Sequence, residues 1–331
     1  MEEGKKRLAV LVGCNYPNTP NELHGCINDV RTMREVLIHR FGFEPVDVEV
    51  LTDEPGSRAM PTGSNIRRAL ESMADRAEAG DVLFFHYSGH GTRVPAVKGH
   101  RHGSKREEAI VPCDFNLITD VDFRQLVNQL PPGASFTIVS DSCHSGGLID
   151  KEKEQIGPSS TPRDTTSTPF TKTIPFESVL AHLASLTGLP SPDIEDHLSN
   201  LFGTTERSLK YTSPDERSHN PVGPDDGILL SGCQADETSA DVNPEEEWGL
   251  GKACGAFSNA IQEVLKEHPG RISNRELVMR ARARLSAQRF AQHPCLYCSD
   301  ENADAAFLWQ PEMARVVGMD QSDGLEFIER K

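Results

Sequence analysis

Short apolar runs alternate with amphipathic helical patterns over the first 150 residues, and this alternation constrains the fold more than any other feature. The apolar runs, which predict strands buried mostly on both faces, are 8–12, 46–51, 82–85 and 136–139. The helical patterns, in which apolar residues recur every three to four positions, are 30–41, 66–77 and 122–130. This order is typical of an α/β fold with a mostly parallel central sheet flanked by helices.

A polar stretch interrupts this pattern. Eight of the fifteen residues from 157 to 171 are Ser or Thr and three are Pro, which favours a loop. A weaker helical pattern covers 176–202, and the segment 157–226 is interpreted as one long linker insertion. Regular structure is expected to resume with strands at 228–230, 296–297 and 306–309, a helix near 257–265 and a helix capped by Ser273 and Glu276.

Two strand ends carry residues suited to nucleophilic catalysis. In open α/β sheets, ligands bind at the carboxyl ends of the strands. The strand at 82–85 leads to His90 between two glycines, and the strand at 136–139 leads to Cys143 in a Ser- and Gly-rich loop. A nucleophilic thiol and its base would meet there. The alternative is a buried, inert Cys143 and a structural loop histidine at 90, and His86 is interpreted as a core residue.

The residue types fit the chemistry of acyl transfer. A thiol with a pKa near 8.5 is mostly protonated at neutral pH, so it needs a base, and His90 can later return the proton to the leaving amine. A thiolate beside an imidazolium is expected to raise the histidine pKa. The neighbouring glycines leave backbone amides free to bind a developing oxyanion.

The motifs resemble those of the plant type II metacaspases, which belong to the caspase-like clan of cysteine peptidases. The residues that carry the resemblance are 8–29, YSGHG at 87–91, EEAIVP at 107–112, DSCHSG at 141–146 and SGCQADETSAD at 231–241. The resemblance implies a caspase-like fold with a large catalytic region at 1–156, a linker with the activation cleavage site at 157–221, and a small region at 222–331.

The resemblance also implies roles for individual residues. Cys143 matches the nucleophile and His90 the base, and the amides of Gly91 and Cys143 match the oxyanion hole. The family cleaves proteins and peptides after Arg or Lys. The substrate-binding residues implied for that specificity are Asp29, Ser88 and Asp141, with Cys26 nearby as a weaker second thiol.

The family stores its members as zymogens and is associated with programmed cell death and autolysis. Self-cleavage after Lys172 is predicted, with Arg163 as the second candidate, because a basic residue in an extended polar segment can enter an acidic pocket. An alternative class is an interaction scaffold with vestigial catalysis. The presence of both Cys143 and His90 favours the enzyme.

Metal sites are the least supported feature of the sequence. The residues matching the family's calcium site are Glu107, Asp120, Asp122 and Asp150, but Val121 interrupts the acidic run. The sequence therefore favours a solvated acidic loop and an enzyme that requires no cofactor. Cys295 and Cys298 have zinc-like spacing, yet no second such pair exists to complete four ligands.

Composition narrows the possible partners. The chain of 331 residues has 34 basic and 50 acidic side chains, a net charge of −16, which disfavours nucleic acid and anionic membranes. No apolar run is long enough to span a membrane, and no export signal is recognised, so eight reduced cysteines and a cytoplasmic location are expected. The expected partners are protein substrates and protein inhibitors of a monomeric enzyme.

Overall fold

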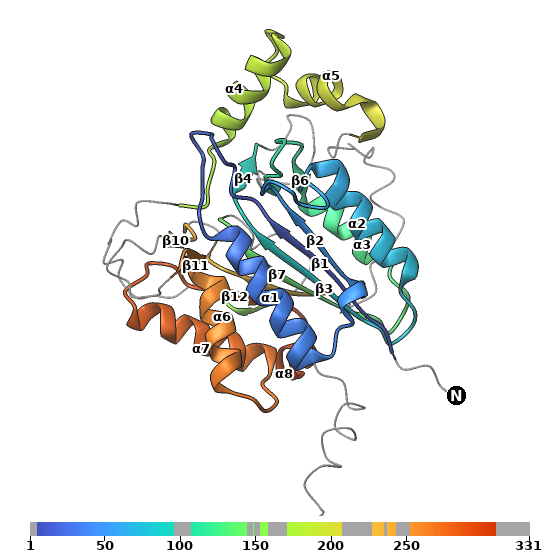
Figure 1. Cartoon of the computed structure of the whole chain (residues 1–331), viewed down its shortest axis with the longest axis vertical. Coiled ribbons are helices and arrows are strands. Elements are labelled where there is room, and N and C mark those ends of the chain that lie inside the picture. Colours follow the sequence, from blue (N-terminus) through green and yellow to red (C-terminus); the bar gives the residue numbers. More distant parts are fainter. Residues whose placement is uncertain are drawn as a thin grey trace, which may run out of the picture.

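A seven-stranded sheet forms the centre of the computed structural model, with strand order β2-β1-β3-β7-β9-β12-β8 (Figure 1). The structure describes residues 5–95, 107–143, 148, 153–157, 171–206, 227–234, 237–242 and 252–308. The first five strands in that order are parallel, whereas β12 runs antiparallel to both neighbours. The strands are β1 Arg7–Gly13, β2 Val48–Thr52, β3 Val82–Ser88, β7 Ser135–Asp141, β8 Glu154–Ile156, β9 Gly227–Ser231 and β12 Cys295–Tyr297.

Helices cover both faces of this sheet because its strands place apolar side chains on alternate sides. On one face Leu11 and Phe84 pack against α1, α6 and α7, and on the other Val10 and Phe85 pack against α2 and α3. The covering helices are α1 Cys26–Phe41, α2 Gly63–Arg76, α3 Asp120–Val127, α6 Ala256–Glu267 and α7 Asn274–Ala287. Two short helices complete the body, the 3-10 helix Pro45–Asp47 and α8 Asp300–Asp304.

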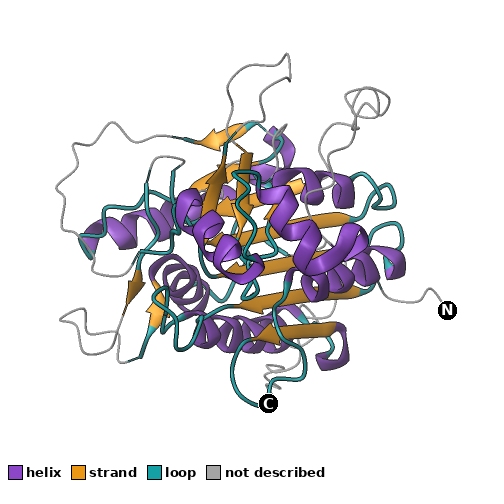
Figure 2. Ribbon diagram, turned by 90° about the horizontal axis from the view of Figure 1, so that it is seen from above, coloured by secondary structure: helices purple, strands orange, loops and turns teal. Residues whose placement is uncertain are grey.

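Smaller sheets lie beyond the carboxyl ends of the central strands (Figures 1 and 2). One sheet comprises β4 Gly91–Val94, β5 Glu107–Ile110 and β6 Ile118–Thr119, and the other pairs β10 Asp241–Val242 with β11 Cys254–Gly255. The linker helices α4 Phe176–Thr187 and α5 Ile194–Glu206 stand above the first sheet in Figure 1. They share an apolar cluster with it, to which Ile174 and Val179 contribute from the linker and Val111 from the body.

Most sequence predictions match these elements, and the differences have local causes. Ser273 caps α7 as expected, its hydroxyl accepting a hydrogen bond from the Glu276 amide at 3.1 Å. The linker helix at 176–202 is divided in two because Gly188 adopts left-handed geometry with φ of 68° and prolines follow. The predicted strand at 306–309 is wrong: Ala306 forms an isolated bridge to Ser273, a turn follows, and residue 309 lies outside the described residues.

Strands from residues 1–156 and from 222–331 lie in one continuous sheet. The division into large region, linker and small region stays a prediction. All eight cysteines are free thiols, as expected. Among the described residues, no helix is both long and apolar enough to cross a membrane.

Candidate active site

His90 and Cys143 follow the carboxyl ends of two neighbouring strands of the central sheet. The register of β3 and β7 pairs Ser88 with Asp141, and each of these residues ends its strand. His90 and Cys143 follow two residues later on neighbouring strands, and both are buried. The parallel pairing therefore places the two residues at one sheet edge, as the sequence predicted.

The His90 ring is fixed with one nitrogen available. Its Nε2 lies 2.8 Å from the Asn21 carbonyl oxygen, which can only accept, so Nε2 carries the proton. Nδ1 is buried and has no hydrogen-bond partner among the described residues. The Tyr16 ring packs on the imidazole at a centroid distance of 4.8 Å. Nδ1 is thus the nitrogen that can accept a proton.

Burial, not a charge partner, sets the protonation of His90 in this form of the chain. Burial, opposed by the backbone of Asn21 and Lys172 and assisted by the positive charge of Lys172, lowers the pKa of His90 to about 4. This differs from the sequence expectation of a raised histidine pKa. The imidazole is neutral at pH 7, the form a general base requires.

The linker residue Lys172 presents its carbonyl to two backbone amides. The Gly91 amide donates to the Lys172 oxygen at 3.0 Å and the Cys143 amide at 3.1 Å. A Cβ atom on residue 91 would lie 1.8 Å from the Cys143 oxygen, so this approach requires glycine. The Ser239 amide donates to Cys143 Sγ at 2.9 Å. The two amides hold this carbonyl as an oxyanion hole holds a substrate carbonyl.

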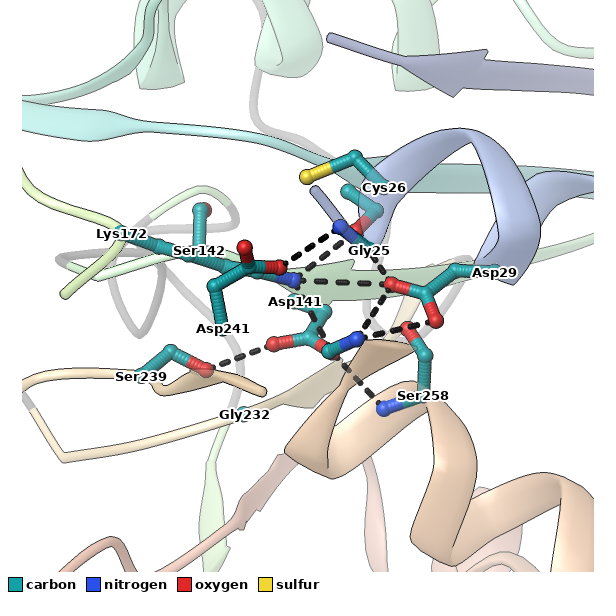
Figure 3. A network of polar contacts seen from close by, with 12 residues as sticks. Gly25, Cys26, Asp29, Asp141, Ser142, Lys172, Gly232, Ser239, Asp241 and Ser258 are labelled. Atoms are coloured by element: carbon teal, nitrogen blue, oxygen red, sulfur yellow. Dashed lines mark hydrogen bonds and ion pairs between the residues drawn. The ribbon is translucent and has the colours of Figure 1, made fainter. Parts of the chain in front are cut away.

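The Lys172 side chain is completely buried among acidic and hydroxyl groups (Figure 3). Its Nζ lies 2.9 Å from Ser88 Oγ, 3.3 Å from Asp141 Oδ2 and 3.6 Å from Asp29 Oδ2. Ser88 Oγ also donates to Asp29 at 2.7 Å. The residues that the sequence assigned to the specificity pocket are therefore brought together around a cation.

The two carboxylates differ in their surroundings. Asp29 accepts hydrogen bonds from the Gly255 amide at 2.9 and 3.0 Å, while Asp141 accepts from Ser239 Oγ at 2.6 Å and the Ser258 amide at 2.8 Å. Burial, opposed by Lys172 and assisted by Asp141, raises the pKa of Asp29 to about 8. Burial also acts on Asp141, but Lys172 and these hydrogen bonds outweigh it and lower its pKa. The negative charge resides mainly on Asp141.

Backbone pairing holds the linker on both sides of Lys172. The Lys172 amide donates to the Ser239 oxygen at 2.9 Å, and Thr171 forms an antiparallel bridge with Ala240. The Ile174 amide donates to the Gly91 oxygen at 3.1 Å. The peptide bond after Lys172 is thus flanked by extended chain paired with the catalytic edge.

Cys26 is the first residue of α1 and borders this cluster (Figure 3). It is fully buried, and burial raises its pKa well above the ordinary thiol value despite the positive charge of Lys172. The sulfur therefore remains a neutral thiol, which is a poor nucleophile.

The acidic residues proposed for calcium have other partners where they are described. Asp122 completes the capping box of α3, accepting the Thr119 amide at 2.8 Å, and Asp120 pairs with Arg124 at 3.1 Å. Asp150 and the candidate cleavage residue Arg163 lie outside the described residues, as does the side chain of Glu107. Asp120 and Asp122, the two members whose side chains are described, are thus engaged within α3 and at its start.

The remaining candidates are core residues. Cys295 and Cys298 are buried, and within the described part of the chain no group of three His, Cys, Asp or Glu residues could hold a metal. His86 is buried as expected, with Nε2 3.1 Å from Ser258 Oγ.

Residues from the second half of the chain complete the site, and sequence reasoning gave them no role. Ser239, Gly255 and Ser258 contact the nucleophile or the two carboxylates. Ser239 lies in the segment 231–241 that carried the family resemblance, which was the available signal. Ser258 lies within the predicted helix near 257–265 and Gly255 just before it, and neither carried a sequence signal for a role in the site.

Comparison with known proteins shows the family to which the chain belongs. The caspase domain matches residues 6–305. A Geobacter sulfurreducens crystal structure shares the fold, with a TM-score of 0.59 at 18% identity over 91% of this chain and 97% of that one. The chain belongs to the caspase-domain family and is a cysteine-type endopeptidase, a hydrolase that acts on proteins.

Its relatives place it among the metacaspases. Metacaspase-9 of Arabidopsis thaliana is 60% identical over 324 residues, which cover 93% of this chain and 98% of that protein. Metacaspase-7 of the same plant is 39% identical over 91% of this chain and 99% of its own length.

Proposed function

We propose that this peptidase cleaves after Arg or Lys and is made as a zymogen whose uncut linker occupies the catalytic site. The observation that carries the proposal is the position of Lys172. Its ammonium lies against Asp141 at 3.3 Å, and its carbonyl accepts both candidate oxyanion-hole amides. A residue bound in this way is positioned as the substrate residue before the cut.

The chemistry follows from these positions. The Cys143 thiol gives its proton to Nδ1 of His90, and the thiolate attacks the carbonyl carbon of Lys172. The amides of Gly91 and Cys143 stabilise the negative charge that develops on the oxygen. As the carbon–nitrogen bond breaks, His90 returns the proton to the departing amine of Thr173. Water then hydrolyses the thioester and regenerates the thiol.

The charges in the pocket account for the proposed specificity. Asp141 and Asp29 attract a guanidinium or an ammonium in a site from which water is excluded. An acidic side chain would meet the negatively charged Asp141 there, and like charges in such a site are strongly disfavoured. Arg and Lys are therefore favoured over Asp at the cleaved position.

Self-cleavage after Lys172 would release the blocking segment. Arg163, the second candidate, lies upstream in the same linker. We also propose that no metal is required and that the active enzyme is a monomer. A part in programmed cell death and autolysis is proposed from the family resemblance alone.

Sequencing the new amino terminus of the processed protein tests the proposal. We expect a start at Thr173 in wild type and in Lys172→Arg, and no cut there in Lys172→Gln or Cys143→Ala. Lys153→Gln is the matched control, because the Lys153 side chain is exposed and its ammonium pairs with Asp300, another exposed residue of the described chain. A Cys143→Ala protein that is still cut when purified alone would exclude self-processing.

A further inference from the structure

Asp241 lies at the edge of the pocket and was not among the substrate-binding residues expected from the sequence. It opens β10, where it pairs with Gly255 of β11, and its side chain is almost completely buried. Figure 3 shows its carboxylate turned toward Gly25, beside the lysine that fills the pocket. A buried carboxylate in this place needs partners, because an unpaired buried charge is strongly destabilising.

The partners of Asp241 are backbone amides at the start of α1. Its Oδ2 accepts the His24 amide at 2.7 Å and its Oδ1 accepts the Gly25 amide at 3.0 Å. Gly25 has no side chain with which to cap the helix. A carboxylate at a helix N-terminus satisfies free amides and interacts favourably with the helix dipole. Asp241 therefore caps α1 from more than two hundred residues away in the sequence.

This cap bears directly on the pocket. Asp29 lies in the first turn of α1, and its amide donates to the Gly25 oxygen at 3.0 Å. A Cβ atom on residue 25 would lie 2.4 Å from the Cys254 backbone, so the helix start and β11 are in close contact. Holding Gly25 in place therefore also holds Asp29 at its distance from the bound cation.

The same short strand pair reaches both pocket carboxylates. Gly255, opposite Asp241, donates its amide to Asp29, and Ser239, two residues before Asp241, donates its hydroxyl to Asp141. The charge of Asp241 also acts on the cation: Lys172 opposes the rise in the pKa of Asp241 that burial causes. Asp241 thus has both a geometric and an electrostatic link to the residue in the pocket.

We propose that Asp241 is a positioning residue for Asp29 and a further acidic group beside the cation, and that it strengthens the preference for a cationic residue before the cut. The inference rests on the proposed Arg/Lys specificity. Asp241 acts by positioning α1 and through its charge, and it takes no part in the chemical step carried out by His90 and Cys143. Its removal should weaken recognition of the cation more than it weakens the chemistry.

The test compares two peptides in the processed enzyme, one with Arg before the cut and one with citrulline, its uncharged analogue. We expect Asp241→Asn to lower the ratio of kcat/KM values, Arg over citrulline, by about tenfold or more, mainly through KM. Asp81→Asn is the matched control, because Asp81 is also buried and accepts two backbone amides, those of Lys6 and Glu78, at the opposite end of β3. It should leave the ratio unchanged.

The outcomes separate the two proposals. A wild-type enzyme that cleaves both peptides equally refutes the proposed specificity. A wild-type preference that survives unchanged in Asp241→Asn, or an equal loss on both peptides, overturns the role of Asp241. Should D241N fail to fold, a carboxyl-labelled wild-type enzyme replaces it. There the Asp241 NMR signal should shift with an Arg peptide aldehyde and not with the citrulline analogue, and no difference between them overturns the inference.

Discussion

Replacing Asp141 by Asn tests the charge that the structure places closest to the bound lysine. The change keeps the side-chain volume and removes the negative charge 3.3 Å from Lys172 Nζ. At an effective dielectric constant of about 20, two unit charges at this distance interact by about 5 kcal/mol. That value is an upper limit for the loss, because Asp29 remains 3.6 Å from the cation.

Asp29 partly compensates for the loss. Asp141 is one of the causes of the raised pKa of Asp29, so its neutralisation lets Asp29 ionise more completely and take over the pairing. We therefore expect a loss of about 2 to 3 kcal/mol, toward the lower end of the range for breaking a desolvated charge pair. Because about 1.4 kcal/mol corresponds to a tenfold change, kcat/KM for an Arg peptide should fall by roughly 30- to 150-fold.

The assay is steady-state hydrolysis of fluorogenic Arg and citrulline peptides by the processed enzyme. The citrulline peptide has no charge to lose, so its kcat/KM should change by less than about threefold. The Asp81→Asn variant again serves as the control for a buried carboxylate far from the site. An Arg value within threefold of wild type, or a parallel fall for citrulline, would show that the pocket is misassigned.

Three further predictions concern the nucleophile, the buried histidines and calcium. Cys143→Ala should retain less than about 1% of wild-type turnover, since Cys26 remains a neutral thiol. A higher residual activity in a fluorogenic assay would contradict this. Because burial lowers the pKa of His90 to about 4 and that of His86 to about 3, both rings of the uncut Cys143→Ala chain should remain neutral at pH 5.5 in an NMR titration. Their contribution to the free energy of unfolding is complete above the ordinary pKa of 6.5 and is lost as pH falls, toward 4 for His90 and toward 3 for His86. Asp122→Ala should lower the free energy of unfolding by about 1 kcal/mol in denaturant unfolding, as the loss of a helix cap does. The activity of the enzyme with a chelator should equal its activity with calcium. Loss of activity with the chelator would show that Glu107 and the acidic residues grouped with it bind a metal.

The central sheet was predictable because its strands are buried on both faces. The residues around 8–12, 82–85 and 136–139 pack under helices on each side, so their apolar runs are continuous. The short strands were missed for the opposite reason. β10 and β11 have two residues each, too few for any periodic pattern, and their positions depend on contacts with α1.

Some features of the candidate site could likewise be predicted from the sequence, and others could not. His90 and Cys143 follow recognisable strand ends, so their convergence could be predicted from parallel pairing. The protonation of His90 could not, because it depends on burial by the loop that includes Tyr16 and Asn21. Asp241 was likewise invisible, since its partners are backbone amides distant in sequence, and backbone amides leave no residue-type signature.

The amides of Gly91 and Cys143 hold the Lys172 carbonyl, so the proposed self-cleavage after Lys172 would have a distinctive time course. A bond held in the site by its own chain reacts without a molecular encounter, so its half-time is independent of dilution. Under this proposal Lys172 fills the pocket of every uncut copy, so an uncut molecule has no open pocket with which to cleave another. The time needed for activation is therefore the same at high and at low concentrations of the uncut chain, because each molecule is cleaved independently of the others.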